Sequence, residues 1–256
     1  MTSLLPVFLA AAMAFPAIAA QQVAGNLPAQ SPRSIAENNP ALTDEVRGDI
    51  MMARKMYRDA IDFYKPGAAK SAVLANKAGI AYHQMGDLDN AKKYYERSIK
   101  LDKTYPEAYN NLGTVQYAKK SYNNAIKNYE RALALTPKAA SVWSNLGTAY
   151  FARKKYNEAL RAYQYALELD PEIFERRGSS GVMLQERSVE EKAMFYYTLA
   201  KSYAQAGDVE RTLRYIRFAL ENGFKDKKRL QEEEAFAPLK NNEQFKELLA
   251  MEHNVL

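Results

Sequence analysis

Residues that carry out catalysis or bind metals are scarce in this sequence. The 256 residues include two histidines and no cysteine. A nucleophile–histidine–acid arrangement would depend on His83, because His253 lies next to the end of the chain. Glu232–Glu234 is interpreted as a solvated acidic turn, and Gly178–Gly181 lacks the lysine of a phosphate-binding loop. We therefore expect no enzyme activity, no metal site and no cofactor. The alternative is an enzyme or polymer-binding accessory that depends on His83.

The strongest pattern in the sequence is an internal repeat. Small residues, tyrosines and prolines recur at a spacing of 34 residues: Gly79, Gly113 and Gly147; Ala91, Ala125 and Ala159; Tyr95, Tyr129 and Tyr163; Pro137 and Pro171. A period of this length is typical of stacked helical hairpins. Glycine and alanine allow two helices to approach closely, while tyrosine fills the wider gaps between them.

The repeat resembles that of the tetratricopeptide repeat family. One copy supplies every position of the family pattern: Trp143, Leu146, Gly147, Tyr150, Ala159, Tyr163, Ala166 and Pro171. The resemblance implies an all-α fold, a right-handed superhelical solenoid of antiparallel helix hairpins. It also implies a scaffold or adaptor that binds a protein or peptide in a concave groove.

Five repeats and a cap are expected along the chain. The repeats are placed at residues 41–71, 72–105, 106–139, 140–171 and 193–224, with an insertion at 172–190. Residues 225–256 are expected to form capping helices, because the last unit of a solenoid exposes apolar surface.

The N-terminal segment indicates export. Residues 1–20 carry no charged side chain and end in Ala17-Ile18-Ala19-Ala20, which is typical of a cleaved signal peptide, and residues 21–40 are interpreted as a flexible linker. Without cysteine there is no site for a lipid anchor, so we expect a periplasmic or extracellular protein of a bacterial envelope. In such a protein the net charge of +6 favours acidic partners over nucleic acid, with membrane contact at most peripheral. The sequence sets no oligomeric state.

Helical periodicity places a set of mostly polar side chains on the groove side of the first helices. They are Asn76, Lys77, Asn110, Asn111, Thr114, Tyr117, Ser144, Asn145, Thr148, Phe151, Tyr197 and Lys201. Asn111 and Asn145 occupy the same repeat position, and stacked carboxamides can pair with a peptide backbone. The alternative is that both asparagines are simply solvated.

Basic residues recur where the hairpins are expected to turn: Arg54-Lys55, Lys119-Lys120 and Arg153-Lys154-Lys155. These residues are interpreted either as solvated turns or as an edge that binds anions. A second functional hypothesis is a structural assembly component that packs through its caps, its convex face or the 172–190 insertion.

Overall fold

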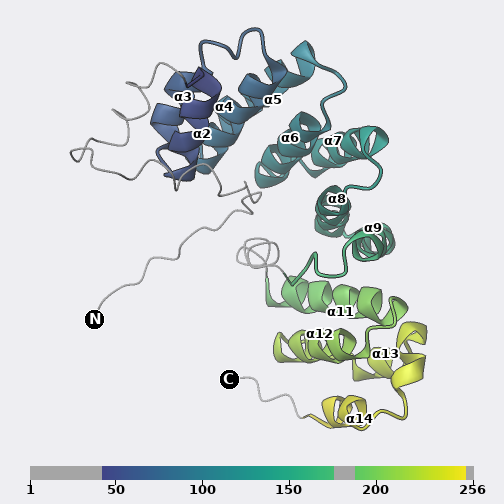
Figure 1. Cartoon of the computed structure of the whole chain (residues 1–256). Helices are drawn as coiled ribbons and strands as arrows, with labels where there is room; N and C mark the ends of the chain where they lie inside the picture. Colours follow the sequence, from purple (N-terminus) through teal and green to yellow (C-terminus); the bar gives the residue numbers. More distant parts are fainter. Residues whose placement is uncertain (1–41, 176–187, 252–256) are drawn as a thin grey trace, which may run out of the picture. The chain divides into compact units, whose positions relative to one another are not determined.

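The computed structural model describes residues 42–175 and 188–251, and all regular structure in these ranges is helical. The expected signal peptide and linker, the Gly178–Gly181 segment and His253 lie outside the described residues. The elements are α2 (Asp44–Ala53), α3 (Tyr57–Tyr64), α4 (Ala72–Gln84), α5 (Leu88–Leu101), α6 (Pro106–Ala118), α7 (Tyr122–Leu135), α8 (Ala140–Ala152), α9 (Tyr156–Leu169), α11 (Val189–Gln205), α12 (Val209–Glu221), α13 (Lys227–Glu232), η2 (Glu234–Leu239) and α14 (Glu243–Ala250) (Figure 1). No helix in the described ranges has the length and apolar character needed to cross a membrane.

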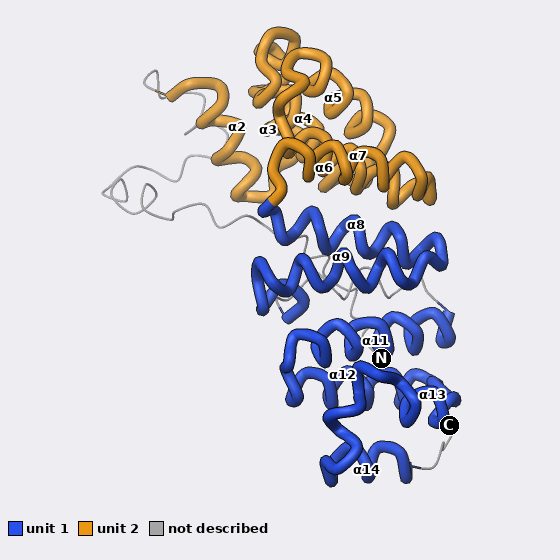
Figure 2. Tube along the Cα trace, turned by 90° about the vertical axis from the view of Figure 1, so that its right-hand side faces the viewer, with its two compact units in different colours: residues 1–11, 138–256 blue, residues 12–137 orange. Residues whose placement is uncertain are grey.

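The helices group into two compact units, divided between Pro137 and Lys138 (Figure 2). In the N-terminal unit, α2 packs on α3, α4 on α5 and α6 on α7, and successive hairpins contact each other through α3–α4 and α5–α6. In the C-terminal unit, α8 pairs with α9 and α11 with α12, and η2 and α14 pack on this last pair. The prediction of an all-α array of helix hairpins with capping helices is confirmed.

In the first four hairpins, a tyrosine ring of the second helix lies against a glycine of the first helix. A Cβ atom added to Gly113 would lie 2.6 Å from Cε1 of Tyr129, and one added to Gly147 would lie 2.5 Å from Cε1 of Tyr163. Gly48 and Gly79 meet Tyr64 and Tyr95 in the same way. The repeated glycine is therefore required by the ring that fills the space where a side chain would start.

The fifth hairpin has different residues at the two positions of this contact. Ala200 stands at the glycine position and Ile216 at the tyrosine position, and both are fully buried. Because isoleucine has no ring reaching across the hairpin, the first helix has room for the Cβ of alanine here. The two positions thus change together within one chain.

The first residues of the expected insertion form a turn that packs on the C-terminal unit. Ile173 and Phe174 are buried in the core of the C-terminal unit, and the Phe174 ring lies edge-on to Tyr163 at a centroid distance of 5.2 Å. At its other end, α11 already begins at Val189, with a reciprocal capping box between Ser188 and Glu191. Ile173 and Phe174 are therefore part of the packed core, and α11 begins within the range expected for the insertion.

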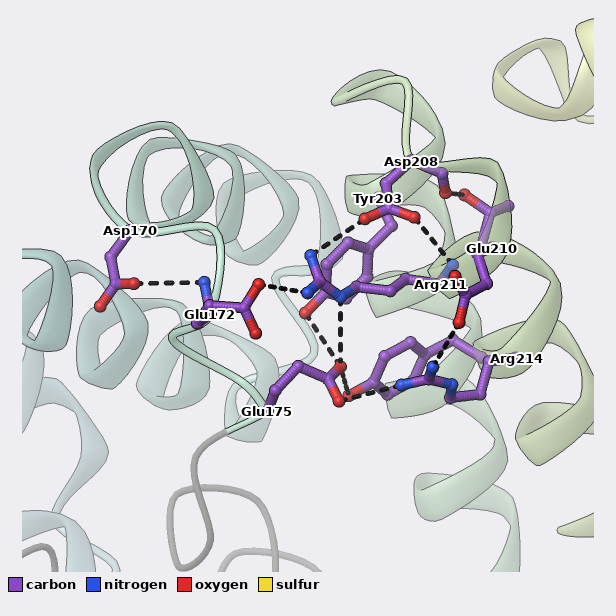
Figure 3. Close-up of polar contacts among 10 residues, drawn as sticks. Asp170, Glu172, Glu175, Tyr203, Asp208, Glu210, Arg211 and Arg214 are labelled. Atoms are coloured by element: carbon purple, nitrogen blue, oxygen red, sulfur yellow. Dashed lines mark hydrogen bonds and ion pairs between the residues drawn. The ribbon is translucent and has the colours of Figure 1, made fainter.

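Ion pairs hold the start of this segment on α11 and α12 (Figure 3). The Glu175 carboxylate accepts hydrogen bonds from Tyr215 Oη at 3.2 Å and from Arg214 Nη1 at 3.0 Å. Arg211 binds Glu172 and also Asp208, the latter at 3.0 Å. Burial, together with Glu175, raises the pKa of the Tyr215 hydroxyl, so it stays a donor to that carboxylate.

The glycine–tyrosine contact predicts the effect of adding one methyl group. Gly113→Ala should lower the free energy of unfolding by about 1–3 kcal/mol, because the new Cβ displaces the Tyr129 ring. The double variant Gly113→Ala/Tyr129→Ile, which copies the fifth hairpin, should recover part of the loss. Thermal unfolding followed by circular dichroism measures both. An unchanged melting temperature for Gly113→Ala would contradict this account of the repeat.

The ion-pair cluster predicts that Glu175 anchors the segment that follows Pro171. Glu175→Gln keeps the shape of the side chain but removes its charge, and should cost roughly 1–3 kcal/mol of stability. Glu210→Gln is the matched control, because Glu210 also pairs with Arg214 but has a side chain that is 84% exposed. Its effect should stay below about 0.5 kcal/mol, since exposed ion pairs contribute little. Equal losses for the two variants in thermal unfolding would rule out a special role for Glu175.

Candidate functional site

Polar side chains connect the first helices of successive hairpins in the N-terminal unit. We call this set, Glu45 and Asp49 on α2, Asn76 and Lys77 on α4, and Asn111 on α6, the first-helix surface. Each of these helices is positioned by the tyrosine contact with its own second helix. The surface therefore contains three of the predicted groove residues and two acidic residues that the sequence patterns did not indicate.

Lys77 joins α4 to α2. Its Nζ lies 2.7 Å from Glu45 Oε1 and 2.7 Å from Asp49 Oδ2, and Asp49 also accepts a hydrogen bond from Tyr64 Oη at 2.6 Å. Burial by itself lowers the pKa of Lys77, but the hydrogen bonds and charges of Asp49 and Glu45 outweigh it and raise that pKa. Lys77 is thus a charged clasp within the chain. Lys77 was predicted to line the groove, and its ammonium group is paired within the chain.

Two asparagines join α4 to α6. Asn111 Nδ2 donates a hydrogen bond to Asn76 Oδ1 at 3.0 Å, and Asn76 Nδ2 donates to Tyr105 Oη at 3.5 Å. Asn76 is only 3% exposed, whereas Asn111 is half-buried. The predicted partner of Asn111 in a ladder was Asn145, which lies on α8 in the C-terminal unit, so that ladder stays a prediction.

The remaining predicted residues of α6 lie beside this pair. Thr114 donates to the backbone carbonyl of Asn110 at 3.1 Å and accepts a hydrogen bond from the buried Tyr129 hydroxyl at 3.3 Å. The Tyr117 ring is half-buried against Tyr122, at a centroid distance of 5.3 Å. Thr114 is therefore committed to closing its own hairpin, and Asn110 and Tyr117 are half-buried.

Three predicted groove residues of α8 are core residues. Ser144, Thr148 and Phe151 are at most 5% exposed. Thr148 Oγ1 lies 3.3 Å from the Tyr163 hydroxyl, and the Phe151 ring lies edge-on to Phe195 of α11 at 5.6 Å. Placing them in a groove was wrong, because a buried tyrosine hydroxyl needs a partner and α11 packs over this part of the hairpin.

The two predicted residues of α11 bind the cap. Tyr197 is buried, stacks on Phe224 at 4.7 Å and donates a hydrogen bond to Glu233 Oε2 at 2.5 Å. Lys201 Nζ lies 2.9 Å from the same oxygen. Burial raises the pKa of Glu233, but the bonds from Tyr197 and Lys201 outweigh it and lower that pKa. The interpretation of Glu232–Glu234 as a solvated turn was wrong for Glu233, whose side chain is 15% exposed.

The chemistry available in the described ranges is hydrogen bonding and charge pairing. No three side chains of the metal-ligating types come together there. His83 on α4 is half-buried, and burial lowers its pKa, which favours the neutral imidazole. The arrangement on α2, α4 and α6 presents a carboxamide beside an ion cluster of one lysine and two carboxylates.

Two family models match the chain. A model described as "TPR repeat" matches residues 79–120 and 115–153, and one described as "Tetratricopeptide repeat" matches residues 140–173. These matches cover the second, third and fourth hairpins. A search of curated proteins finds no significant match.

Solved structures with a similar fold include two of MamA. A crystal structure of MamA is 22% identical with a TM-score of 0.50, covering 68% of this chain and 93% of that chain. MamA from Desulfovibrio magneticus RS-1 is 19% identical with a TM-score of 0.50, covering 79% of this chain and 98% of that chain. The first TPR of Spaghetti (RPAP3), bound to an HSP90 peptide, is 28% identical with a TM-score of 0.41, covering 42% and 85% of the two chains.

The likeness to MamA concerns the fold alone. It agrees with the paired helices of the described residues. Together with the matching repeat models, these features show that residues 79–173 are built of tetratricopeptide repeats.

Proposed function

We propose that this protein is a non-catalytic scaffold that binds a segment of another protein through the first-helix surface of its N-terminal unit. The tetratricopeptide repeats of residues 79–173 support a role in protein interaction. The observation that carries the proposal is the hydrogen bond from Asn111 to Asn76. It holds the half-buried Asn111 carboxamide in one orientation.

The Asn111 side chain retains binding capacity after making this bond. A carboxamide has two N–H donors and an oxygen acceptor, and the bond to Asn76 uses one donor. The remaining donor and acceptor match the C=O and N–H of a peptide group. Because the side chain is already ordered, a ligand does not have to immobilise it, and this favours affinity.

The charges near Asn111 are paired with one another within the surface and leave a net charge of −1. Lys77 is paired with Glu45 and Asp49, so the adjoining cluster carries one positive and two negative charges. Such a surface suits hydrogen bonding to a peptide backbone better than capture of a carboxylate. The corresponding surface of the fifth hairpin is covered by Glu233 and the rest of the cap, so we place binding on the N-terminal unit.

A second candidate function is structural assembly of copies of the chain. An exposed apolar strip on α9 favours it: Tyr165 and Leu169 lie one helical turn apart and are 50% and 40% exposed. The Tyr165 ring stacks on Trp143 at 4.8 Å, which orders it for contact with a partner.

Photocrosslinking at defined positions distinguishes these two functions. A photoreactive amino acid at Gln84, an exposed residue near the end of α4, should yield adducts with a different protein in the native host. The same group at Asn123, exposed on the second helix α7, is the control and should yield none. Adducts formed only at Tyr165, and only with the same chain, would support assembly and contradict peptide binding.

The affinity of the crosslinked segment then tests the role of Asn111. Asn111→Ala should weaken binding about 5–10-fold, the effect of losing one or two hydrogen bonds of about 0.5–1.5 kcal/mol each. Asn123→Ala, the same substitution on α7, should leave the Kd unchanged. Isothermal titration calorimetry with the synthetic segment measures the Kd of both variants. Equal Kd values would contradict binding at the first-helix surface.

We also propose that the protein is exported to the bacterial envelope, on the basis of the uncharged N-terminal segment and its small-residue ending. When the full chain is expressed in a bacterial host, the periplasmic fraction should contain a form that begins near Gln21. Intact-mass measurement and N-terminal sequencing give the start. Recovery of an uncleaved chain in the cytoplasm alone would contradict export.

A further inference from the structure

The turns within the hairpins share one strained backbone position. In all five hairpins, the residue after the C-cap of the first helix has positive φ: Lys55 at 59°, Gly86 at 78°, Lys120 at 58°, Lys154 at 60° and Gly207 at 78°. Within residues 42–175 and 188–251, these lysines are the only residues other than glycine with positive φ. Glycine adopts this conformation without penalty, whereas any residue with a Cβ is disfavoured there.

Helix stability does not explain the lysines. A cation near a helix C-terminus is favourable, but the C-cap residues Arg54, Lys119 and Arg153 already provide one at ordinary negative φ. A lysine at the next position adds backbone strain, because it has a Cβ, and its charge is repelled by the cation at the C-cap. Its side chain is exposed in each of the three turns. Strained residues of this kind persist where they serve binding or catalysis.

The three turns of the N-terminal unit lie side by side. Lys119, at the α6–α7 turn, forms an ion pair with Asp89 at the start of α5. The α2–α3 and α4–α5 turns together line an open hollow of about 320 Å³, formed by Lys55, Met56, Tyr57, Arg58, Asp59 and Met85. Four exposed cations, Arg54, Lys55, Lys119 and Lys120, thus flank the central turn. We call these cations, together with the hollow, the tip edge.

We propose that the tip edge is a second binding site, separate from the first-helix surface, for an acidic protein segment that carries an apolar side chain. Carboxylates of the segment pair with the left-handed lysines, and the apolar side chain enters the hollow between Met56 and Met85. The concave, partly apolar lining favours a protein segment over a lipid surface. Charges placed at one edge also raise the rate at which an acidic partner is captured.

The chain itself provides matched variants for a test. Lys55→Gly and Lys120→Gly convert two tips into the backbone type of Gly86 and Gly207, removing charge and relieving strain. Gly86→Lys does the reverse, and a Cβ there would meet no atom within 4 Å. Lys127→Gln removes an exposed lysine of α7 away from the turns and is the charge control. Asn111→Ala tests independence from the first-helix surface.

The probe is a fluorescein-labelled peptide of glutamates with a central leucine, and its anisotropy is measured with the full chain at low and high salt. The Lys55→Gly/Lys120→Gly variant should bind at least about fivefold more weakly, with a melting temperature equal to or above that of the natural chain. Gly86→Lys should bind about two- to fivefold more tightly. Lys127→Gln and Asn111→Ala should each match the natural chain.

Several outcomes overturn the proposal. One is an unchanged Kd in Lys55→Gly/Lys120→Gly, and another is equal binding of the same peptide with glutamine in place of glutamate. A loss of binding in Lys127→Gln as large as in the double variant would indicate net charge alone. Sedimentation with phosphatidylglycerol vesicles, lost in the double variant, in the absence of peptide binding would assign the edge to a lipid surface.

Discussion

The packing of a tyrosine ring against a glycine is the contact on which the rest of this structure depends. The ring occupies the space where the side chain of the opposing helix would begin, so the two helices of a hairpin can lie close together. The tyrosine hydroxyl is buried together with the ring and therefore needs a hydrogen-bond partner. Asp49, Thr114 and Thr148 provide that partner, and each directly follows the glycine of its hairpin. In these three hairpins the contact thus determines the glycine, the tyrosine and the polar residue that follows the glycine.

Several polar side chains on the first helices are bound to other parts of the chain. Thr148 serves the core, Lys77 holds α2 against α4, and Lys201 holds the cap against α11. In both lysine clasps, partly desolvated carboxylates and ammonium groups offset the energy of burying one another. The direction of the pKa of Lys77, upward, and of Glu233, downward, follows from these pairings. By contrast, the bond of Asn111 to Asn76 uses one of its amide N–H groups, and Lys55, Lys120 and Lys154 of the turns are exposed.

The two surfaces proposed for binding differ in their physics. Near Asn111 the charges are paired internally, so affinity there depends on hydrogen-bond geometry and preorganisation. At the tip edge, exposed cations sit at the ends of helices, where long-range attraction brings an acidic partner to the surface. We propose that the tip edge attracts an acidic partner and that the first-helix surface forms hydrogen bonds with a peptide backbone.

The sequence by itself determined the repeat length, the hairpins and the residue types at the helix contacts, because those contacts lie within one period of 34 residues. It also indicated the basic turns. Only the tertiary structure decided which polar residues bind other residues of the chain, because their partners come from neighbouring hairpins. Glu45, for example, binds Lys77 from 32 residues away. Helical periodicity gives the face on which a side chain lies but not what packs over it, as for Phe151 under α11. The positive φ of the three lysines is also visible only in the tertiary structure, because lysine is common in turns and the residue type does not reveal φ.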